Sequence, residues 1–78
     1  MSDTSADEAL SALERDIELQ RKKLLELARR LRPGLTEDDL TQPHDFRELT
    51  ESWHFQYEEG FLSGLLAAQL TLRRICRK

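Results

Sequence analysis

The strongest constraint on the fold is a regular spacing of apolar residues in the first part of the chain. Steps of three and four residues alternate along a stripe made of Leu10, Leu13, Ile17, Gln20, Leu24, Leu27 and Leu31. This heptad spacing places the side chains on one side of an α-helix and is typical of coiled coils, in which helices pack along their length. It predicts a helix over about residues 6–32, which is ended by Pro33 and Gly34.

Gln20 is the one polar member of this stripe. A buried polar residue at such a position can fix the register or the oligomeric state of a coiled coil, at some cost in stability. In a symmetric dimer the two copies of Gln20 could hydrogen-bond each other. Alternatively, Gln20 lies at the edge of the stripe, and the sequence favours neither interpretation.

A second helix is expected over about residues 54–76. Its expected packing stripe consists of Tyr57, Phe61, Leu65, Ala68, Leu72 and Ile75. Leu62, Leu66 and Leu70 broaden this stripe, and a separate line of small residues consists of Gly60, Gly64, Ala67 and Thr71. Its two glycines lie one turn apart, although glycine costs about 1 kcal/mol relative to alanine in a helix interior. We interpret the two glycines as the place of a close helix–helix contact, either within the chain or between two chains.

Residues 33–53 join the two helices, and we expect this connector to be packed and partly helical. Thr36 can cap a short helical turn, and Pro43 ends that turn because a residue before proline avoids the α conformation. Residues 1–5 are few, polar and terminal, so we expect them to be disordered. The remainder, residues 6–78, is expected to form a single domain.

The sign of the charge alternates in four blocks, although the net charge of the chain is only −3. Residues 1–20 and 34–59 are acidic, whereas residues 21–33 and 60–78 are basic. In an antiparallel pair of helices each acidic block lies beside a basic one, while a parallel pair brings like charges together. Each exposed ion pair contributes only ~0–1 kcal/mol, but the layout distinguishes the two orientations. The sequence therefore predicts an all-α fold built as an antiparallel helical hairpin.

A chain of 78 residues buries only a small core, and such domains usually need further stabilisation. A disulfide cannot form within the chain because Cys76 is the only cysteine. Surplus apolar surface on both helices leads us to expect a homodimer in which two hairpins form a four-helix bundle. The residues expected to pack between helices or between chains are Leu10, Leu13, Ile17, Gln20, Leu24, Leu27, Leu31, Gly60, Phe61, Gly64, Leu65, Ala68 and Leu72.

Most of the aromatic residues are concentrated around the end of the connector. They have two interpretations: a plug that closes one end of the hairpin, which we favour, or a binding patch for a protein partner. An exposed Trp53 would favour the patch. The residues of this candidate partner surface are Asp38, Asp39, His44, Phe46, Trp53, Phe55 and Tyr57.

The sequence contains no pattern that is typical of an active site or a metal centre. His44 and His54 are far apart, and neither a His-x-x-x-His nor a Cys-x-x-Cys spacing occurs. Ser52 and His54 share the connector region, but a nucleophile and a base also need an orienting group and a pocket. We therefore expect that the protein is not an enzyme and that it uses neither a metal nor a cofactor.

The basic run of residues 21–32 suggests nucleic-acid binding as an alternative. No aromatic residue is interleaved with these bases and the chain is acidic overall, so we interpret the run as helix-end charge. The leading hypothesis is a non-enzymatic protein-interaction or adaptor protein that acts as a homodimer. The alternative is a small nucleic-acid-associated regulator that uses residues 21–32 and 73–78. Without a long apolar segment or a signal sequence, we expect a cytoplasmic protein that does not insert into a membrane.

Overall fold

The computed structural model describes the backbone of residues 2–76 and the side chains of residues 5–76, and all regular structure in that range is helical. Two long helices are joined by a connector of short turns. In chain order, the elements are α1 (Ser2–Leu31), the 3₁₀ turns η1 (Asp38–Thr41) and η2 (Pro43–Asp45), α2 (Arg47–Thr50) and α3 (Trp53–Cys76). The prediction of an all-α fold is confirmed for these residues.

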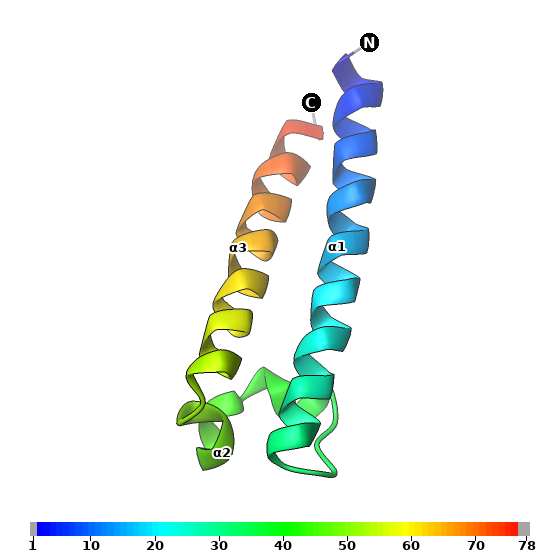
Figure 1. Ribbon diagram of the computed structural model, residues 1–78. Coiled ribbons are helices and arrows are strands. Elements are labelled where there is room, and N and C mark those ends of the chain that lie inside the picture. Colours follow the sequence, from blue (N-terminus) through cyan, green and yellow to red (C-terminus); the bar gives the residue numbers. More distant parts are fainter. Residues whose placement is uncertain (1, 77–78) are drawn as a thin grey trace.

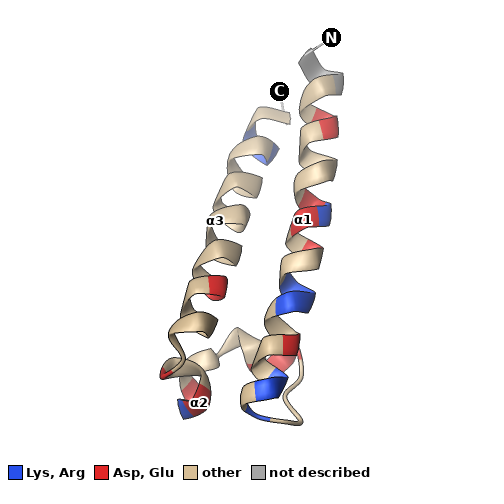
Figure 2. Ribbon diagram, viewed as in Figure 1, with Lys and Arg blue, Asp and Glu red and all other residues tan. Residues whose placement is uncertain are grey.

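Helices α1 and α3 lie side by side and run in opposite directions, with the connector folded across one end (Figure 1). Figure 2 shows the basic last turns of α3 beside the acidic first half of α1. Two ion pairs join the helices: Arg73 Nη2 lies 3.2 Å from Glu14 Oε2, and Lys23 Nζ lies 3.4 Å from Glu58 Oε2. Both follow the acid-to-base layout of the charge blocks.

Helix α1 begins at Ser2, whereas the sequence led us to expect disorder over residues 1–5; Met1 lies outside the described residues. Residues 2–5 contain neither glycine nor proline, the two residues that most disfavour a helix. At its other end α1 stops at Leu31. Gly34 then adopts a φ of 94°, in the left-handed region that favours glycine.

The core lies at the connector end of the molecule. Its buried members come from both long helices and from the connector, and they are Leu24, Ala28, Leu35, Leu49 and Phe55. Phe46 is half-buried and packs against this cluster, while the guanidinium of Arg32 sits 4.9 Å from its ring centre. The connector is therefore packed against the long helices through the buried Leu35 and Leu49 and the half-buried Leu40.

The side of α3 that packs against α1 differs from the side that the sequence predicts. A heptad stripe of buried and half-buried residues consists of Phe55, Glu58, Leu62, Leu65, Gln69, Leu72 and Cys76, and Glu59 and Leu66 are half-buried beside it. By contrast, Tyr57, Phe61 and Ala68 from the expected stripe are exposed. The difference arises because two positions of the actual stripe, Glu58 and Gln69, are polar, so counting apolar residues selects a neighbouring side of the helix.

Candidate protein-interaction surface

One side of α3 presents apolar and small residues to solvent along its whole length. We call this side the α3 outer face, and its members are Trp53, Tyr57, Gly60, Phe61, Gly64, Ala68, Thr71 and Ile75. Helical spacing places them on one side of the helix, away from the stripe that contacts α1. Trp53 is 80% exposed, Tyr57 63% and Phe61 52%. Exposed apolar patches of this kind commonly mark interaction sites.

The two glycines of the outer face do not contact another helix in the described part of the chain. A Cβ atom added at Gly60 or at Gly64 would find nothing within 4 Å among these residues. The close helix–helix contact that the sequence suggested is therefore not made between α1 and α3. The backbone of α3 is open to approach from outside at both positions.

Helix α1 extends the apolar surface on one flank. Leu19 is exposed, and it shares a shallow groove of about 370 Å³ with Phe61 and Leu65. The groove runs between the two long helices, and its polar lining comes from Asp16, Gln20 and Lys23. Together, the outer face and this groove present apolar groups from both helices.

The aromatic residues that we grouped as one candidate partner surface divide between core and surface. Phe55 is fully buried and therefore cannot contact a partner, because it occupies the first position of the α1-facing stripe. Phe46 is half-buried against the core. Trp53 and Tyr57 are exposed and belong to the outer face, so the plug interpretation holds for Phe46 and Phe55 but not for Trp53 and Tyr57.

The acidic and histidine members of that group lie in the connector. Asp38 and His44 are exposed, and His44 Nε2 lies 3.6 Å from Asp45 Oδ1. Asp39 is half-buried, and its Oδ2 accepts hydrogen bonds from the backbone N–H of Thr36 at 2.9 Å and from its hydroxyl at 3.1 Å. The connector thus places Asp39 in a structural role, apart from the outer face.

The stripe that we predicted on the first helix faces α3. Ile17, Gln20 and Leu24 are buried, and the half-buried members are Leu10, Leu13, Leu27 and Leu31. From the second helix, Leu65 and Leu72 are half-buried at the same interface, whereas Gly60, Phe61, Gly64 and Ala68 are exposed. The predicted packing residues therefore separate into those that join α1 to α3 and those that lie on the outer face.

Gln20 joins the two helices of one chain. Its Nε2 donates to the backbone oxygen of Glu58 at 3.0 Å and to Glu58 Oε1 at 2.7 Å. The hydrogen bond from Gln20 is the largest cause that holds the pKa of Glu58 below its usual value, with smaller contributions from Lys23 and His54. Burial of the carboxyl acts in the opposite direction. Gln20 therefore lies inside the stripe and not at its edge, and its amide bonds within one chain.

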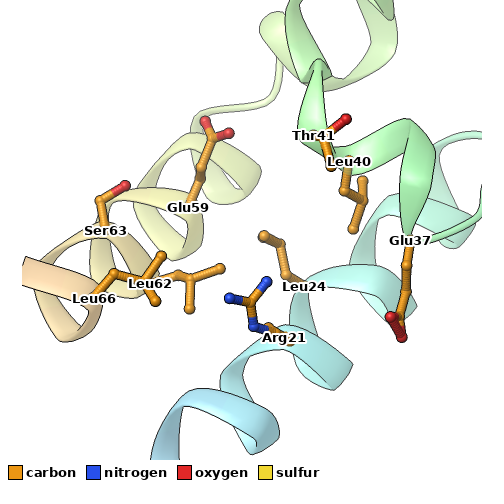
Figure 3. A pocket seen from close by; sticks show the side chains of 9 residues that line it. All are labelled: Arg21, Leu24, Glu37, Leu40, Thr41, Glu59, Leu62, Ser63 and Leu66. Carbon is orange, nitrogen blue, oxygen red and sulfur yellow. The ribbon is translucent and has the colours of Figure 1, made fainter. Parts of the chain in front are cut away.

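A second hollow lies between α1, η1 and α3. It has a volume of about 230 Å³, and Figure 3 shows Leu24, Leu40 and Leu62 from the three segments around a common space. Polar side chains, Arg21 and Glu59 among them, line its margin. No pattern in the sequence indicates this groove, because its walls come from three separate segments. It is smaller than the usual ligand pocket of ≈300–1,000 Å³, and its size suits one apolar side chain.

Ser52, His54 and Cys76 are the side chains that could act as a nucleophile or a base, and each lies at or near an end of α3. The hydroxyl of Ser52 accepts a hydrogen bond from the backbone N–H of Phe55 at 3.1 Å, which caps the start of α3. His54 Nε2 lies 3.6 Å from Glu58 Oε2, and Cys76 is half-buried at the end of α3. Among the described residues, no group of three or more His, Cys, Asp or Glu side chains is placed to hold a metal ion.

Several bases of the run 21–32 have partners within the chain. Arg29 Nε donates to the backbone oxygen of Leu35 at 2.8 Å, and Arg32 Nη1 lies 3.7 Å from Glu48 Oε1. Lys23 pairs with Glu58, as described above. These contacts join part of the basic run to the connector and to α3, while the three side chains remain exposed.

None of the helices within residues 2–76 combines the length and the apolar character needed to cross a membrane.

Comparisons of the chain with protein-family models, with curated proteins and with solved structures found no match.

Proposed function

We propose that this is a non-enzymatic, cytoplasmic protein-interaction protein that acts as a homodimer, with the α3 outer face as its self-association surface. The observation that carries the proposal is the exposure of Trp53, Tyr57 and Phe61 on one charge-free side of a helix. Tryptophan and tyrosine are enriched among the residues that contribute most to binding at protein interfaces. In water, these side chains expose apolar area that burial stabilises by roughly 25 cal/mol per Å².

The dimensions of the outer face suit a dimer of ordinary size. A standard interface buries roughly 800 Å² per partner, which is about a seventh of the 5859 Å² accessible surface of the chain. The 24 residues of α3 extend over ~36 Å, and Leu19 widens the contact toward α1. Pairing two such faces brings four long helices together as a bundle.

An adaptor also needs surface that the dimer leaves free. The groove between α1, η1 and α3 lies on a different side of α3, since its lining residues Glu59, Leu62 and Leu66 are separate from the outer face. It therefore stays accessible when two outer faces pair. A partner protein with one projecting apolar side chain would fit this groove.

Sedimentation equilibrium at micromolar concentration tests the proposal. The chain should sediment with twice its mass of 9.1 kDa, and Phe61→Lys should shift it to the monomer because a lysine ammonium would have to be desolvated in the interface. Leu70→Lys is the matched control, because Leu70 is similarly exposed at 61% but lies on another side of α3. A folded wild-type monomer at these concentrations would contradict the proposal.

The alternative, a nucleic-acid-associated regulator, has less support because Lys23, Arg29 and Arg32 have partners within the chain. A salt titration of the protein against generic duplex DNA separates the two functions. Contacts to phosphates release counterions, so binding through the basic run would weaken steeply with added salt. The interaction-protein proposal predicts no salt-dependent binding in this assay.

A further inference from the structure

We propose that α3 pairs with α3 of a second copy in the antiparallel orientation, about a two-fold axis that passes beside Gly64. This inference rests on the proposed self-association and specifies its geometry. It commits the outer face to one occupant, a second copy of the same chain. The argument comes from the order of large and small residues along the face, from its charges and from the open backbone at its centre.

Apart from Phe61, the outer face has a symmetric layout about Gly64. Trp53 and Ile75 lie equally far from Gly64 along α3, and so do Tyr57 and Thr71. In each pair, the bulky aromatic residue lies on the N-terminal side and a smaller residue lies on the C-terminal side. Gly60 and Ala68 form a third, inner pair at equal distances.

A two-fold axis through the centre brings together residues that lie equally far from it on opposite sides. An interface of this kind uses the same patch on both chains and must be complementary to itself. With the axis beside Gly64, Tyr57 lies opposite the Thr71 of the second copy, and Trp53 lies opposite its Ile75. Each contact between an aromatic side chain and a smaller residue then occurs twice in the dimer, once on either side of the axis.

The parallel orientation does not give this match. It would set each residue against its own copy, with Trp53 on Trp53 and Tyr57 on Tyr57 at one end. At the other end, Ala68 and Thr71 would face their own copies and leave gaps, which cost packing energy. Aromatic bulk would hold the first halves apart while the second halves needed a close approach.

Charge favours the antiparallel pair as well. The last turn of α3 carries Arg74 as well as Arg73, which pairs with Glu14, whereas the exposed Glu51, which pairs with Arg47, precedes its first turn. Antiparallel pairing brings the basic end of each helix near the acidic end of its partner, and opposed helix dipoles interact favourably. Parallel pairing would bring the two basic ends together.

The backbone at the centre is open to a close contact. Nothing in the described part of the chain lies within 4 Å of a Cβ added at Gly64. Packed helices lie 8–10 Å apart depending on the side chains between them, and a glycine at the crossing permits the short end of that range. This contact would offset the cost of glycine in the middle of α3.

Cysteine cross-linking in a Cys76→Ser background tests the orientation and the position of the axis. A disulfide needs Cα atoms about 4.4–6.8 Å apart. Gly64→Cys, at the axis, should form disulfide-linked dimers with itself. Tyr57→Cys should not, because its two copies lie roughly 21 Å apart along the helices. A mixture of Tyr57→Cys with a mass-tagged Thr71→Cys chain should instead give the mixed dimer.

The outcomes separate the geometry from the self-association itself. Self-linkage of Tyr57→Cys would show a parallel pair, and a dimer by sedimentation without the mixed Tyr57/Thr71 linkage would place the axis elsewhere; either result overturns this inference and leaves the dimer intact. If Gly64→Cys itself weakens the dimer, the mixed linkage still decides. A monomer by sedimentation would defeat both proposals and leave the outer face to another kind of partner.

Discussion

Glu58 is a carboxylate on the packed side of α3, surrounded by polar groups from two helices. Gln20 donates two hydrogen bonds to this residue, to its backbone oxygen and to its carboxylate, while Lys23 and His54 lie on its other oxygen. Buried polar groups need such partners, because an unsatisfied one costs free energy on folding. Glu58 and Gln20 therefore fix how α3 is rotated against α1, since other rotations separate them.

The lowered pKa of Glu58 has a consequence for stability against acid. Because the folded state holds the proton less tightly than the unfolded state does, this carboxylate contributes stability above the ordinary glutamate pKa, about 4.3, and loses it as the pH falls through the lowered value. Gln20→Leu removes the largest cause of the shift. We expect the free energy of unfolding of this variant to depend less on pH in the acid range below the ordinary glutamate pKa, as measured by urea unfolding.

Gln69→Leu is the control for this experiment. Gln69 also joins α3 to α1, through a longer 3.4 Å hydrogen bond to Glu14 Oε2, but it does not contact Glu58. Gln69→Leu should leave the pH dependence of the unfolding free energy in the acid range unchanged. An equal flattening in both variants would show that Gln20 is not the source of the acid sensitivity.

Phe55 and Trp53 form a second contrast at the scale of single residues. Phe55→Ala opens a cavity in the core and should lower the free energy of unfolding by about 3–5 kcal/mol, since Phe55 is completely buried. Trp53→Ala should change the stability of the monomer little, because Trp53 is exposed. Chemical denaturation at a concentration below the dimer dissociation constant measures both. A loss under 1 kcal/mol for Phe55→Ala would contradict the core described above.

At the scale of elements, the sequence predicts the first helix better than the second. Its heptad stripe is almost wholly apolar, so the period and the buried side coincide, and all its members from Leu10 to Leu31 are buried or half-buried. In α3, apolar residues lie on two sides of the helix. The buried side contains Glu58 and Gln69 among its leucines, whereas the uncharged outer face is exposed. The apolar pattern alone therefore does not identify the buried side.

The substitution Gly64→Ala should have opposite effects on the stability of the monomer and of the proposed dimer. Gly64→Ala should stabilise the monomer by about 1 kcal/mol through helix propensity, since nothing in the described chain lies within 4 Å of the new methyl. The same methyl should weaken the dimer by separating the crossing helices. Unfolding at low protein concentration measures the first effect, and the concentration dependence of the sedimenting mass measures the second.

Ser63→Ala provides the comparison for this substitution. Ser63 is exposed in α3 and lines the groove between α1, η1 and α3, so its substitution raises helix propensity without touching the outer face. It should stabilise the monomer slightly and leave the dimer unchanged. If Gly64→Ala also left the dimer unchanged, the glycine would not lie at the contact.

At the scale of the whole molecule, the charge blocks and the connector act together. Antiparallel helices bring Arg73 to Glu14 and Lys23 to Glu58, as the order of the blocks along the sequence predicts. The groove of Figure 3 could not be predicted in this way, because no spacing in the sequence relates Leu40 to Leu24 or Leu62. The division of the aromatic residues also depends on the rotation of α3, which polar contacts set.

The exposed outer face remains the central feature of the molecule, and Trp53 reports on it directly as the only tryptophan in the chain. We expect its fluorescence emission to lie at shorter wavelength at high protein concentration, where a dimer covers the indole, and to shift to longer wavelength on dilution as the mass falls to 9.1 kDa. An emission typical of exposed tryptophan at every concentration, with a constant monomer mass, would contradict the account.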